Sequence, residues 1–241
     1  MKIKSIWLRR IHKWVGLAIG LQFVLWAISG AAMALLDMEA VAGGSRPQAI
    51  QSSLAGGASG WPEIVGRLDS GRIEALRLST LLDRPVIEVR TARSTQMFEA
   101  RTGEQVRITA AVARAVAQAA HPDDARPLSA AILTEAAPPV REHEPPIWQV
   151  EFADEESSTY YVSATTGVLL ERRNETWRWW DFFWMLHNMD YADRTSFNHP
   201  LIITAGIAMA WLAVTGFWLL FRTMWRHDSV WIRKLYISRR H

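Results

Sequence analysis

The 241-residue sequence contains no cysteine. This absence excludes disulfide bonds, thiolate zinc sites and iron–sulfur clusters held by cysteine, because each of these needs cysteine sulfur. A redox centre in this chain must therefore use histidine, methionine or a bound organic cofactor. The sequence also lacks a glycine-rich phosphate loop, a dinucleotide fingerprint, a serine nucleophile elbow and a zinc-protease helix motif. These absences exclude a Rossmann-type nicotinamide site and leave no recognisable hydrolase centre.

Charged residues are missing from two long stretches, residues 14–36 and residues 200–221. About 20 apolar residues are enough for a helix to span the hydrocarbon core of a bilayer. The first stretch follows basic residues, as a signal peptide does, but it is longer than the usual apolar core of a signal peptide. We therefore predict two transmembrane helices, at 14–36 and 199–221, in contact with the lipid bilayer.

The charges outside these stretches are distributed unevenly. Residues 1–13 contain five Lys or Arg and no acid, and the tail 222–241 contains six Lys or Arg and one Asp. The segment between the helices contains 16 basic and 23 acidic residues. By the positive-inside rule, both termini are expected in the cytoplasm and the central segment in the periplasm of a bacterium, across the inner membrane. Because the basic residues flank membrane helices, they do not predict a nucleic-acid partner.

The segment between the two helices has the pattern of a small folded domain. Residues 37–60 are rich in Gly, Ser and Ala and predict a linker. The domain expected at 61–173 contains two helical segments, WPEIVGRL at its start and TAAVARAVAQAA at 109–120. Alternating apolar segments, typical of strands with one buried face, follow each helix.

The order of helix and then three strands occurs twice, at about 61–106 and 109–171. FEARTGEQV (98–106) matches VSATTGVLL (162–170), and each has Thr-Gly where a tight turn between strands needs a positive φ. The predicted fold class is therefore an α+β membrane protein. Two transmembrane helices flank a domain of two helix-plus-antiparallel-sheet repeats.

Three segments carry a family resemblance. YYVSATTGVLLE (160–171) resembles the terminal hairpin of the PepSY domain, a small helix-on-antiparallel-sheet module. RRIHKWVGLAIG (9–20) and AVTGFWLLF (213–221) resemble helices of PepSY-associated transmembrane proteins. That family includes inner-membrane ferric and ferric-siderophore reductases that hold b-type haem between their helices. The resemblance implies haem b, with one or two haems per chain or haem shared across a homodimer.

Two candidate haem ligands lie near the outer end of the second apolar stretch. Residues 174–194 are rich in Trp and predict an amphipathic helix in the outer interface, which carries His187. His199 precedes Pro200, a good first-turn residue. Haem iron accepts imidazoles on opposite faces, so it needs two histidines from different elements. The alternative is that both histidines are interfacial anchors, since a histidine costs little there.

Two further candidates lie at the cytoplasmic side. His12 heads a helix face that includes Gly16 and Gly20, and a porphyrin could lie against such small residues. The same Gly-xxx-Gly spacing also suits close contact between two helices, which is compatible with a cofactor pocket. His227 follows the second apolar stretch and could approach His12, although a solvated position in the tail is the alternative.

Two other histidines predict no cofactor. His143 lies between Glu142 and Glu144, and carboxylates suit hard cations, but a solvated loop is the expected environment. His121 ends the 109–120 helix, where its interaction with the helix dipole is favourable.

The predicted function is a b-haem reductase that moves electrons across the inner membrane to periplasmic ferric iron or ferric chelates, for iron uptake. The electron donor is expected to be quinol or a separate flavin reductase, and a homodimer would form a four-helix bundle. One alternative is a non-enzymatic, membrane-anchored PepSY module that binds or inhibits an envelope partner such as a peptidase. Another is a copper-binding protein that uses the His and Met residues near 185–199.

Overall fold

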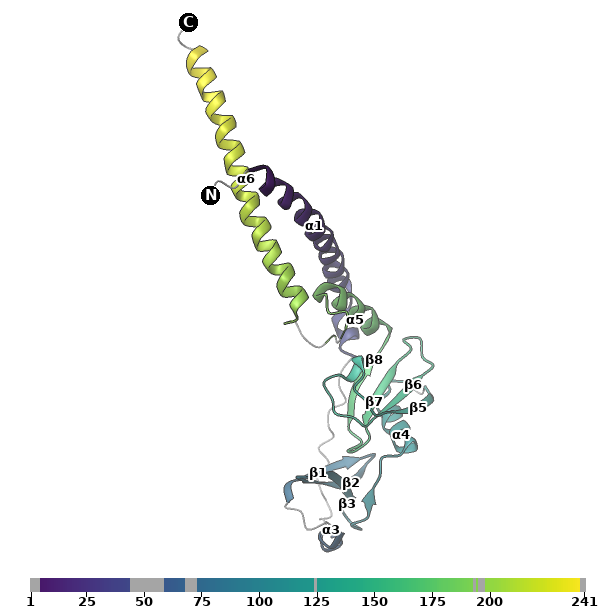
Figure 1. The fold of residues 1–241 in the computed structure, drawn as a ribbon. Helices are drawn as coiled ribbons and strands as arrows, with labels where there is room; N and C mark the ends of the chain where they lie inside the picture. The colour runs from purple at the N-terminus through teal and green to yellow at the C-terminus, as the bar shows by residue number, and fades with distance from the viewer. Residues whose placement is uncertain are drawn as a thin grey trace. The chain divides into compact units, whose positions relative to one another are not determined.

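The computed structural model describes residues 5–43, 59–67, 73–123, 125–192, 194 and 198–238, without the side chains of residues 5, 6 and 224–238. The chain forms two compact units. The helical unit consists of Met1–Leu35 and Phe182–His241, and the α+β unit consists of Leu36–Asp181. Figure 1 shows the elements of both units in chain order. Of the predicted linker 37–60, residues 44–58 lie outside the described residues.

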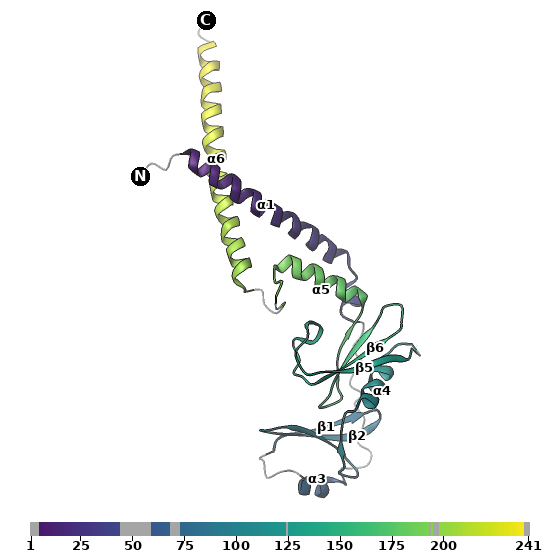
Figure 2. The same ribbon diagram turned by 45° about the vertical axis from the view of Figure 1, so that its right-hand side comes forward.

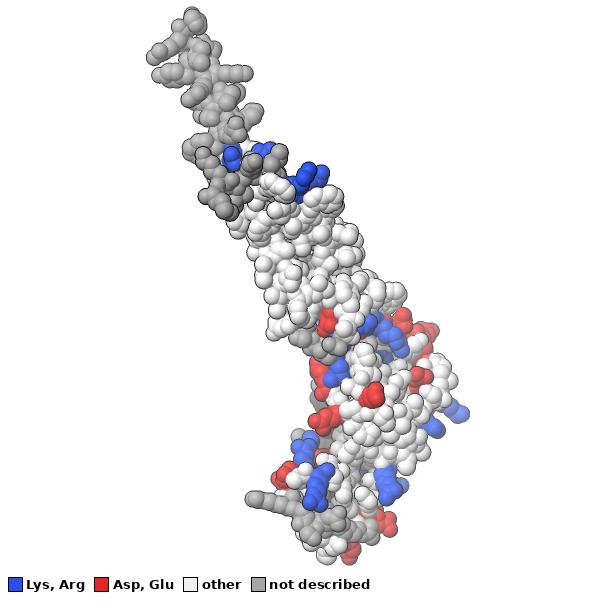
Figure 3. Space-filling model, in the orientation of Figure 1, with Lys and Arg blue, Asp and Glu red and all other residues white. Residues whose placement is uncertain are grey.

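The helical unit contains two long helices, α1 (Ser5–Leu35) and α6 (Pro200–Ser238). Each includes a segment long and apolar enough to cross a membrane, Trp7–Leu35 and Pro200–Thr223. Most of these side chains are exposed, which water would penalise but lipid does not. On the face drawn in Figure 3, the surface over α1 and α6 carries no charge until Lys and Arg appear where α1 begins. The two predicted transmembrane helices are confirmed.

Helix α5 (Glu175–Asn188) begins in the α+β unit and ends in the helical unit. Its first turn is capped by Asn174, whose side-chain oxygen accepts the backbone N–H of Trp177 at 2.8 Å. Pro200 opens α6, where its missing N–H and fixed φ suit the first turn. The backbone oxygen of His199 accepts the N–H of Ile203 at 3.3 Å, so the chain enters α6 directly from His199.

The first half of the α+β unit is an antiparallel sheet in the order β1-β2-β3-β4. Its strands are β1 (Ile73–Leu81), β2 (Arg84–Thr91), β3 (Thr95–Glu99) and β4 (Gln105–Val106). Helix α3 (Trp61–Arg67) packs on this sheet through Ile64, which contacts a cluster containing Val89 and Phe98. Alternation along β2 and β3 explains this cluster, because every second side chain faces the helix.

The second half repeats the arrangement in the order β5-β6-β7-β8. Its strands are β5 (Pro127–Leu133), β6 (Ile147–Phe152), β7 (Thr159–Ser163) and β8 (Leu169–Arg173). Helix α4 (Ala110–Ala120) buries Ala113 and Ala117 against Val150 and Tyr160. Two short elements complete the unit, α2 (Met38–Val41) and the 3-10 helix η1 (Pro138–Val140).

The repeat of one helix with one antiparallel sheet is therefore confirmed, and Figure 2 shows the two sheets as separate ribbons. Gly103 and Gly167 have φ of 70° and 68°, as the matching Thr-Gly turns predict. Each sheet has four strands where the sequence predicted three per repeat. The prediction missed β5, because PLSAAIL contains Pro, Ser and Ala, which are poor strand formers, and does not alternate.

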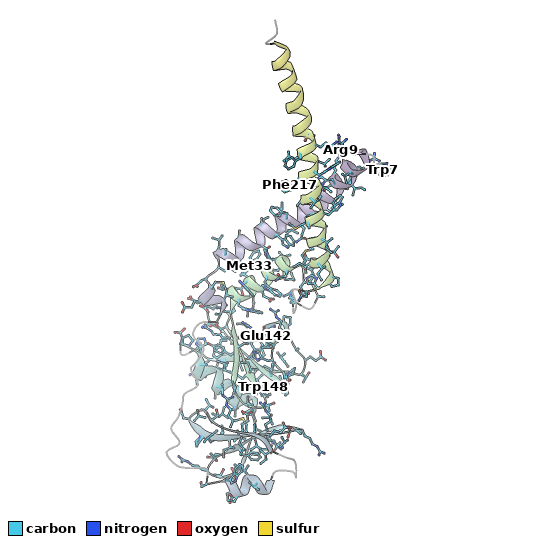
Figure 4. The ribbon with its side chains drawn as sticks, turned by 90° about the vertical axis from the view of Figure 1, so that its left-hand side faces the viewer. Trp7, Arg9, Met33, Glu142, Trp148 and Phe217 are labelled. Atoms are coloured by element: carbon cyan, nitrogen blue, oxygen red, sulfur yellow. The ribbon has the colours of Figure 1, made fainter. Side chains whose placement is uncertain are left out.

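The two halves of the α+β unit share a core. Leu81 and Ile108 belong to a buried cluster that also contacts Trp148 from the second sheet. The indole N–H of Trp148, labelled in Figure 4, donates to the backbone oxygen of Ile108 at 2.8 Å. A Cβ on Gly167 would lie 2.7 Å from the Leu81 side chain, so the second turn packs tightly against the first sheet.

Candidate functional site

His12 lies on α1 and contacts α6 through one ring nitrogen. Its Nδ1 lies 2.7 Å from the hydroxyl oxygen of Thr215. That hydroxyl donates its own hydrogen within α6, to the backbone oxygen of Trp211 at 2.8 Å. If the hydroxyl hydrogen is engaged in this way, the oxygen accepts from the imidazole and His12 carries its hydrogen on Nδ1. The lone pair is then on Nε2, which has no hydrogen bond among the described residues.

His187 lies near the end of α5 and contacts α1 in the same manner. Its Nδ1 lies 3.2 Å from the hydroxyl oxygen of Ser29. Ser29 donates its hydrogen to the backbone oxygen of Leu25 at 2.7 Å. The tautomer follows as before, with the hydrogen of His187 on Nδ1 and the lone pair on Nε2.

A glycine and a tryptophan accompany each histidine. The ring centroids of His12 and Trp211 are 6.1 Å apart, and those of His187 and Trp26 are 6.5 Å apart. A Cβ on Gly216 would lie 3.6 Å from Cε1 of His12, whereas a Cβ on Gly30 would lie 3.2 Å from Cε1 of His187. The absence of a side chain lets each ring lie against the backbone of the neighbouring helix, and the fit is tighter at Gly30.

Both hydroxyl–glycine pairs come from the same short pattern, AISG at 27–30 in α1 and AVTG at 213–216 in α6. Ser29 is 1% exposed and Thr215 is 8% exposed, and they are the most buried of the polar residues described in α1 and α6. Neither was predicted from the sequence as a functional residue. The repeated pattern was the signal that could have identified them.

The two histidine sites lie at opposite ends of α1. The rise from residue 12 to residue 29, at about 1.5 Å per residue, is about 26 Å. Figure 4 marks these ends, with Trp7 and Arg9 near the end that carries His12 and Met33 near the end that carries Ser29. His12 and His187 therefore cannot bind the same metal ion.

His199 is held by a different interaction. Its Nε2 lies 2.7 Å from the backbone oxygen of Asn188, the last residue of α5. Carbonyl groups at the end of a helix have no partner within the helix, so the imidazole N–H satisfies one of them. His199 thus lies beside the turn that follows His187, as the predicted pair required, but its Nε2 is engaged. His227 lies within α6, and its side chain lies outside the described residues.

Histidines in the α+β unit face carboxylates. The Nε2 of His121 lies 3.1 Å from Asp154, and the Nε2 of His143 lies 2.9 Å from Glu171. The His143 side chain is 28% exposed, so the expected solvated loop position is accompanied by a hydrogen bond to Glu171. The parts of the chain that the structure describes contain no group of three His, Asp or Glu that could hold a metal ion.

Asp154 also accepts the backbone N–H of Ser158 at 2.6 Å. Burial opposes ionisation of this carboxyl, but the hydrogen bonds from Ser158 and from His121 outweigh it, so the pKa of Asp154 lies below its usual value. Desolvation raises the pKa of the nearby Tyr160 to about 12. Asp154 is therefore ionised and structural at neutral pH.

A family model described as the PepSY-associated TM region matches residues 9–241. The chain belongs to this family. The match covers both membrane helices and the α+β unit of this chain. Searches of curated proteins and of solved structures found no match to this chain.

In this PepSY-associated protein, the helical unit also contains hydrogen-bond donors without acceptors. The side-chain nitrogens of Gln22 and Trp26 are buried and have no hydrogen-bond partner in the described structure. Residues 22, 26 and 29 lie on one face of α1, so these donors share a face with the Ser29 hydroxyl. An unpaired donor is costly in apolar surroundings. Together with the imidazole of His187, which contacts Ser29, this face has the chemistry to bind a transition metal carried by an organic group with acceptor atoms.

Proposed function

We propose that this protein is a b-haem oxidoreductase of the bacterial inner membrane that reduces ferric iron or ferric chelates on the periplasmic side. His12 and His187 would hold haem, each through Nε2. One observation carries the proposal. His12 and His187 each contact a hydroxyl through Nδ1 and have no hydrogen bond at Nε2 among the described residues, whereas His121, His143 and His199 all have Nε2 engaged.

The residues present fit haem iron. A histidine that binds a metal almost always donates its other ring N–H to a fixed partner, which sets the tautomer and raises the basicity of the ligand. Thr215 and Ser29 are such partners for His12 and His187. Gly216 and Gly30 leave the rings in contact with helix backbone, and the unpaired donors of Gln22 and Trp26 can accommodate acceptor atoms. When bound, haem supplies one-electron chemistry that the side chains of this chain lack.

The chain's own contribution is orientation and exclusion of water. Hydrogen bonds to buried hydroxyls hold both imidazole rings, and lipid around the apolar helices would exclude water from the ligand nitrogens. Oxidation of one quinol to quinone releases two electrons and two protons, which suffices to reduce two ferric ions to ferrous ions. A separate flavin reductase is the other donor class. Ferrous iron is held less tightly by hard oxygen ligands, so reduction would release iron from a chelate for uptake.

The charge distribution supports the orientation that we propose. Lys and Arg flank both apolar helices at the ends formed by residues 1–13 and 222–241, which favours a cytoplasmic location for both termini. The acidic α+β unit would then lie in the periplasm, and the Ser29–His187 site near the periplasmic surface. The His12–Thr215 site would lie near the cytoplasmic donor.

A homodimer is part of this proposal. Each end of the helical unit offers one imidazole nitrogen, and haem iron can take a second axial ligand. A second copy related by a two-fold axis would offer the same nitrogen at the same depth in the membrane. The mass of the detergent-solubilised particle measures this directly.

The experiment is an absorption spectrum of the full chain, purified in detergent from haem-supplemented cells, before and after dithionite. We expect a Soret band that shifts and sharpens on reduction, with b-type α and β bands, and reoxidation of the reduced protein by ferric citrate. A colourless protein would overturn the proposal and favour the membrane-anchored binding module. Copper without porphyrin in a metal analysis would favour the copper-binding alternative.

A further inference from the structure

We propose that Ser29 and Thr215 are positioning residues that fix the tautomers of His187 and His12, and so determine which ring nitrogen is available as a ligand. The consequence for a bound haem rests on the proposed function. The tautomers themselves do not, because they follow from hydrogen bonds within the chain.

The hydroxyl hydrogens of Ser29 and Thr215 are donated to backbone oxygens of their own helices. Serine and threonine in helices often donate to the backbone oxygen four residues earlier. Ser29 donates to Leu25 and Thr215 donates to Trp211 in this way. Each oxygen retains lone pairs and no hydrogen, so it accepts from the imidazole that contacts it. The hydroxyl thereby selects the Nδ1–H form of each histidine.

A hydroxyl that donates to its own helix backbone does not by itself position a histidine. Two other threonines of α6 show this. Thr204 donates to Pro200 at 2.7 Å and Thr223 donates to Leu219 at 2.8 Å, yet both are exposed and neither contacts a histidine side chain that the structure describes. Ser29 and Thr215 make the same internal bond, but they are buried and each also contacts an imidazole. The histidine contact, rather than the helical bond, distinguishes the two positions.

An apolar environment strengthens the preference of each histidine for the Nδ1–H tautomer. In water, either ring nitrogen can donate to solvent at little cost. Between membrane helices, an N–H without an acceptor loses its hydrogen bond outright. The Nε2–H form would leave the Nε2 N–H unpaired. It would also either place two lone pairs face to face at Nδ1 or make the hydroxyl give up its bond within the helix.

The hydroxyl–imidazole hydrogen bonds at the two positions differ in length. The Thr215 oxygen lies 2.7 Å from Nδ1 of His12, and the Ser29 oxygen lies 3.2 Å from Nδ1 of His187. A shorter hydrogen bond makes the imidazole a stronger electron donor through its other nitrogen. Removing the Thr215 hydroxyl should therefore weaken the electron donation of His12 more than removing the Ser29 hydroxyl weakens that of His187.

The first test needs no cofactor. We would record ¹⁵N NMR spectra of the full chain, labelled at histidine and expressed without haem, with His12→Ala and His187→Ala as assignment variants. The wild type should have both histidines in the Nδ1–H form. Ser29→Ala should change the tautomer of His187 alone, Thr215→Val should change that of His12 alone, and Thr204→Val should change neither. An Nε2–H form at either wild-type histidine would overturn the inference.

The second test is a potentiometric titration of the haem-loaded full chain. Thr215→Val and Ser29→Ala should each raise the midpoint potential of one component, because a weaker donor stabilises ferric iron less, and the Thr215→Val shift should be the larger. Thr215→Ser and Ser29→Thr keep the hydroxyl and should stay near wild type, as should Thr223→Val. Unchanged potentials in both hydroxyl deletions, or an equal shift in Thr223→Val, would overturn the inference.

The two tests separate the two proposals. A chain without haem in every preparation would overturn the proposed function and the redox consequence, while the tautomers would still be decided by NMR. Haem-loaded protein with wild-type potentials in Thr215→Val and Ser29→Ala would leave the reductase proposal standing and remove the positioning role.

Discussion

Two histidines of the helical unit, His12 and His187, contact hydroxyls through Nδ1, whereas His121 and His143 of the α+β unit contact carboxylates through Nε2. The kind of hydrogen-bond acceptor that each histidine contacts depends on whether water or apolar side chains surround it. A carboxylate is acceptable at the water-exposed α+β unit, where Asp154 and Glu171 are partly solvated. An ionised carboxylate between membrane helices would cost several kcal/mol, so a neutral hydroxyl is the acceptor that apolar surroundings permit.

The difference also separates two uses of histidine. In the α+β unit both Nε2 atoms are engaged in contacts that stabilise the fold. At His12 and His187 the hydrogen bond orients the ring through Nδ1, and Nε2 has no hydrogen bond among the described residues. Histidine number or spacing does not distinguish these cases; the identity of the engaged nitrogen does.

The largest expected effect comes from deleting the rings. His12→Ala and His187→Ala should each lower the haem content per chain, and the double variant should abolish the Soret band, because under the proposed function each ring would supply the ligand nitrogen of its site. His121→Ala and His143→Ala are matched controls that should keep the wild-type haem content. Loss of haem in a control equal to the loss in His187→Ala would remove the distinction between the two units.

A smaller effect should distinguish the two helical sites from each other. Gly30→Ala places a Cβ 3.2 Å from the His187 ring, whereas Gly216→Ala places one at 3.6 Å from His12, an ordinary contact distance. Forcing a ring out of a packed position costs about 1 kcal/mol or more. Gly30→Ala should therefore shift one component of the reduced spectrum, and Gly216→Ala should not. Equal responses would mean that the two sites are packed alike.

In the α+β unit, the stabilisation contributed by the carboxylate partner of His121, Asp154, depends on pH. The pKa of Asp154 lies below its ordinary value of 3.8, so the native state binds fewer protons than the unfolded state between the two values. The stabilisation from this group is complete above about pH 4 and is lost as the pH falls through the native pKa. Asp154→Asn should lower stability by about 1 to 2 kcal/mol at pH 7, with the difference disappearing in acid.

Hydrogen exchange of the β6 and β7 amides measures this effect locally, as a variant to wild-type ratio at each pH. The haem spectrum of Asp154→Asn should be unchanged at pH 7. A difference in exchange that persists at pH 2 would contradict the assignment of the stabilisation to the ionised carboxyl.

His199→Ala should have the smallest effect. It removes the N–H that satisfies the backbone oxygen of Asn188, which costs about 1 kcal/mol where water can partly replace it. We expect faster hydrogen exchange at the end of α5 and nearly normal haem content. Complete loss of one haem component would instead make His199 a ligand and weaken the rule that the engaged nitrogen identifies the ligand.

Local sequence patterns were sufficient for the framework of this protein. The length of the two charge-free stretches predicted α1 and α6, because a helix is the conformation that satisfies its own backbone in lipid. Alternation and matching Thr-Gly turns predicted the repeated antiparallel sheet. The missed strand β5 lacks such alternation, and its pairing with β6 provides what its composition does not.

The hydrogen-bond partners of the histidines could not be predicted from local sequence patterns. His12 and Thr215 are 203 positions apart, and His187 and Ser29 are 158 positions apart. Which hydroxyl meets which ring depends on how α1 packs against α6 and α5, and a residue's own neighbours along the chain do not encode that packing. Sequence alone could place histidines at the two ends of an apolar helix. Helix packing determined which ring nitrogen each one keeps free, because an imidazole hydrogen goes to the nearest acceptor in three dimensions.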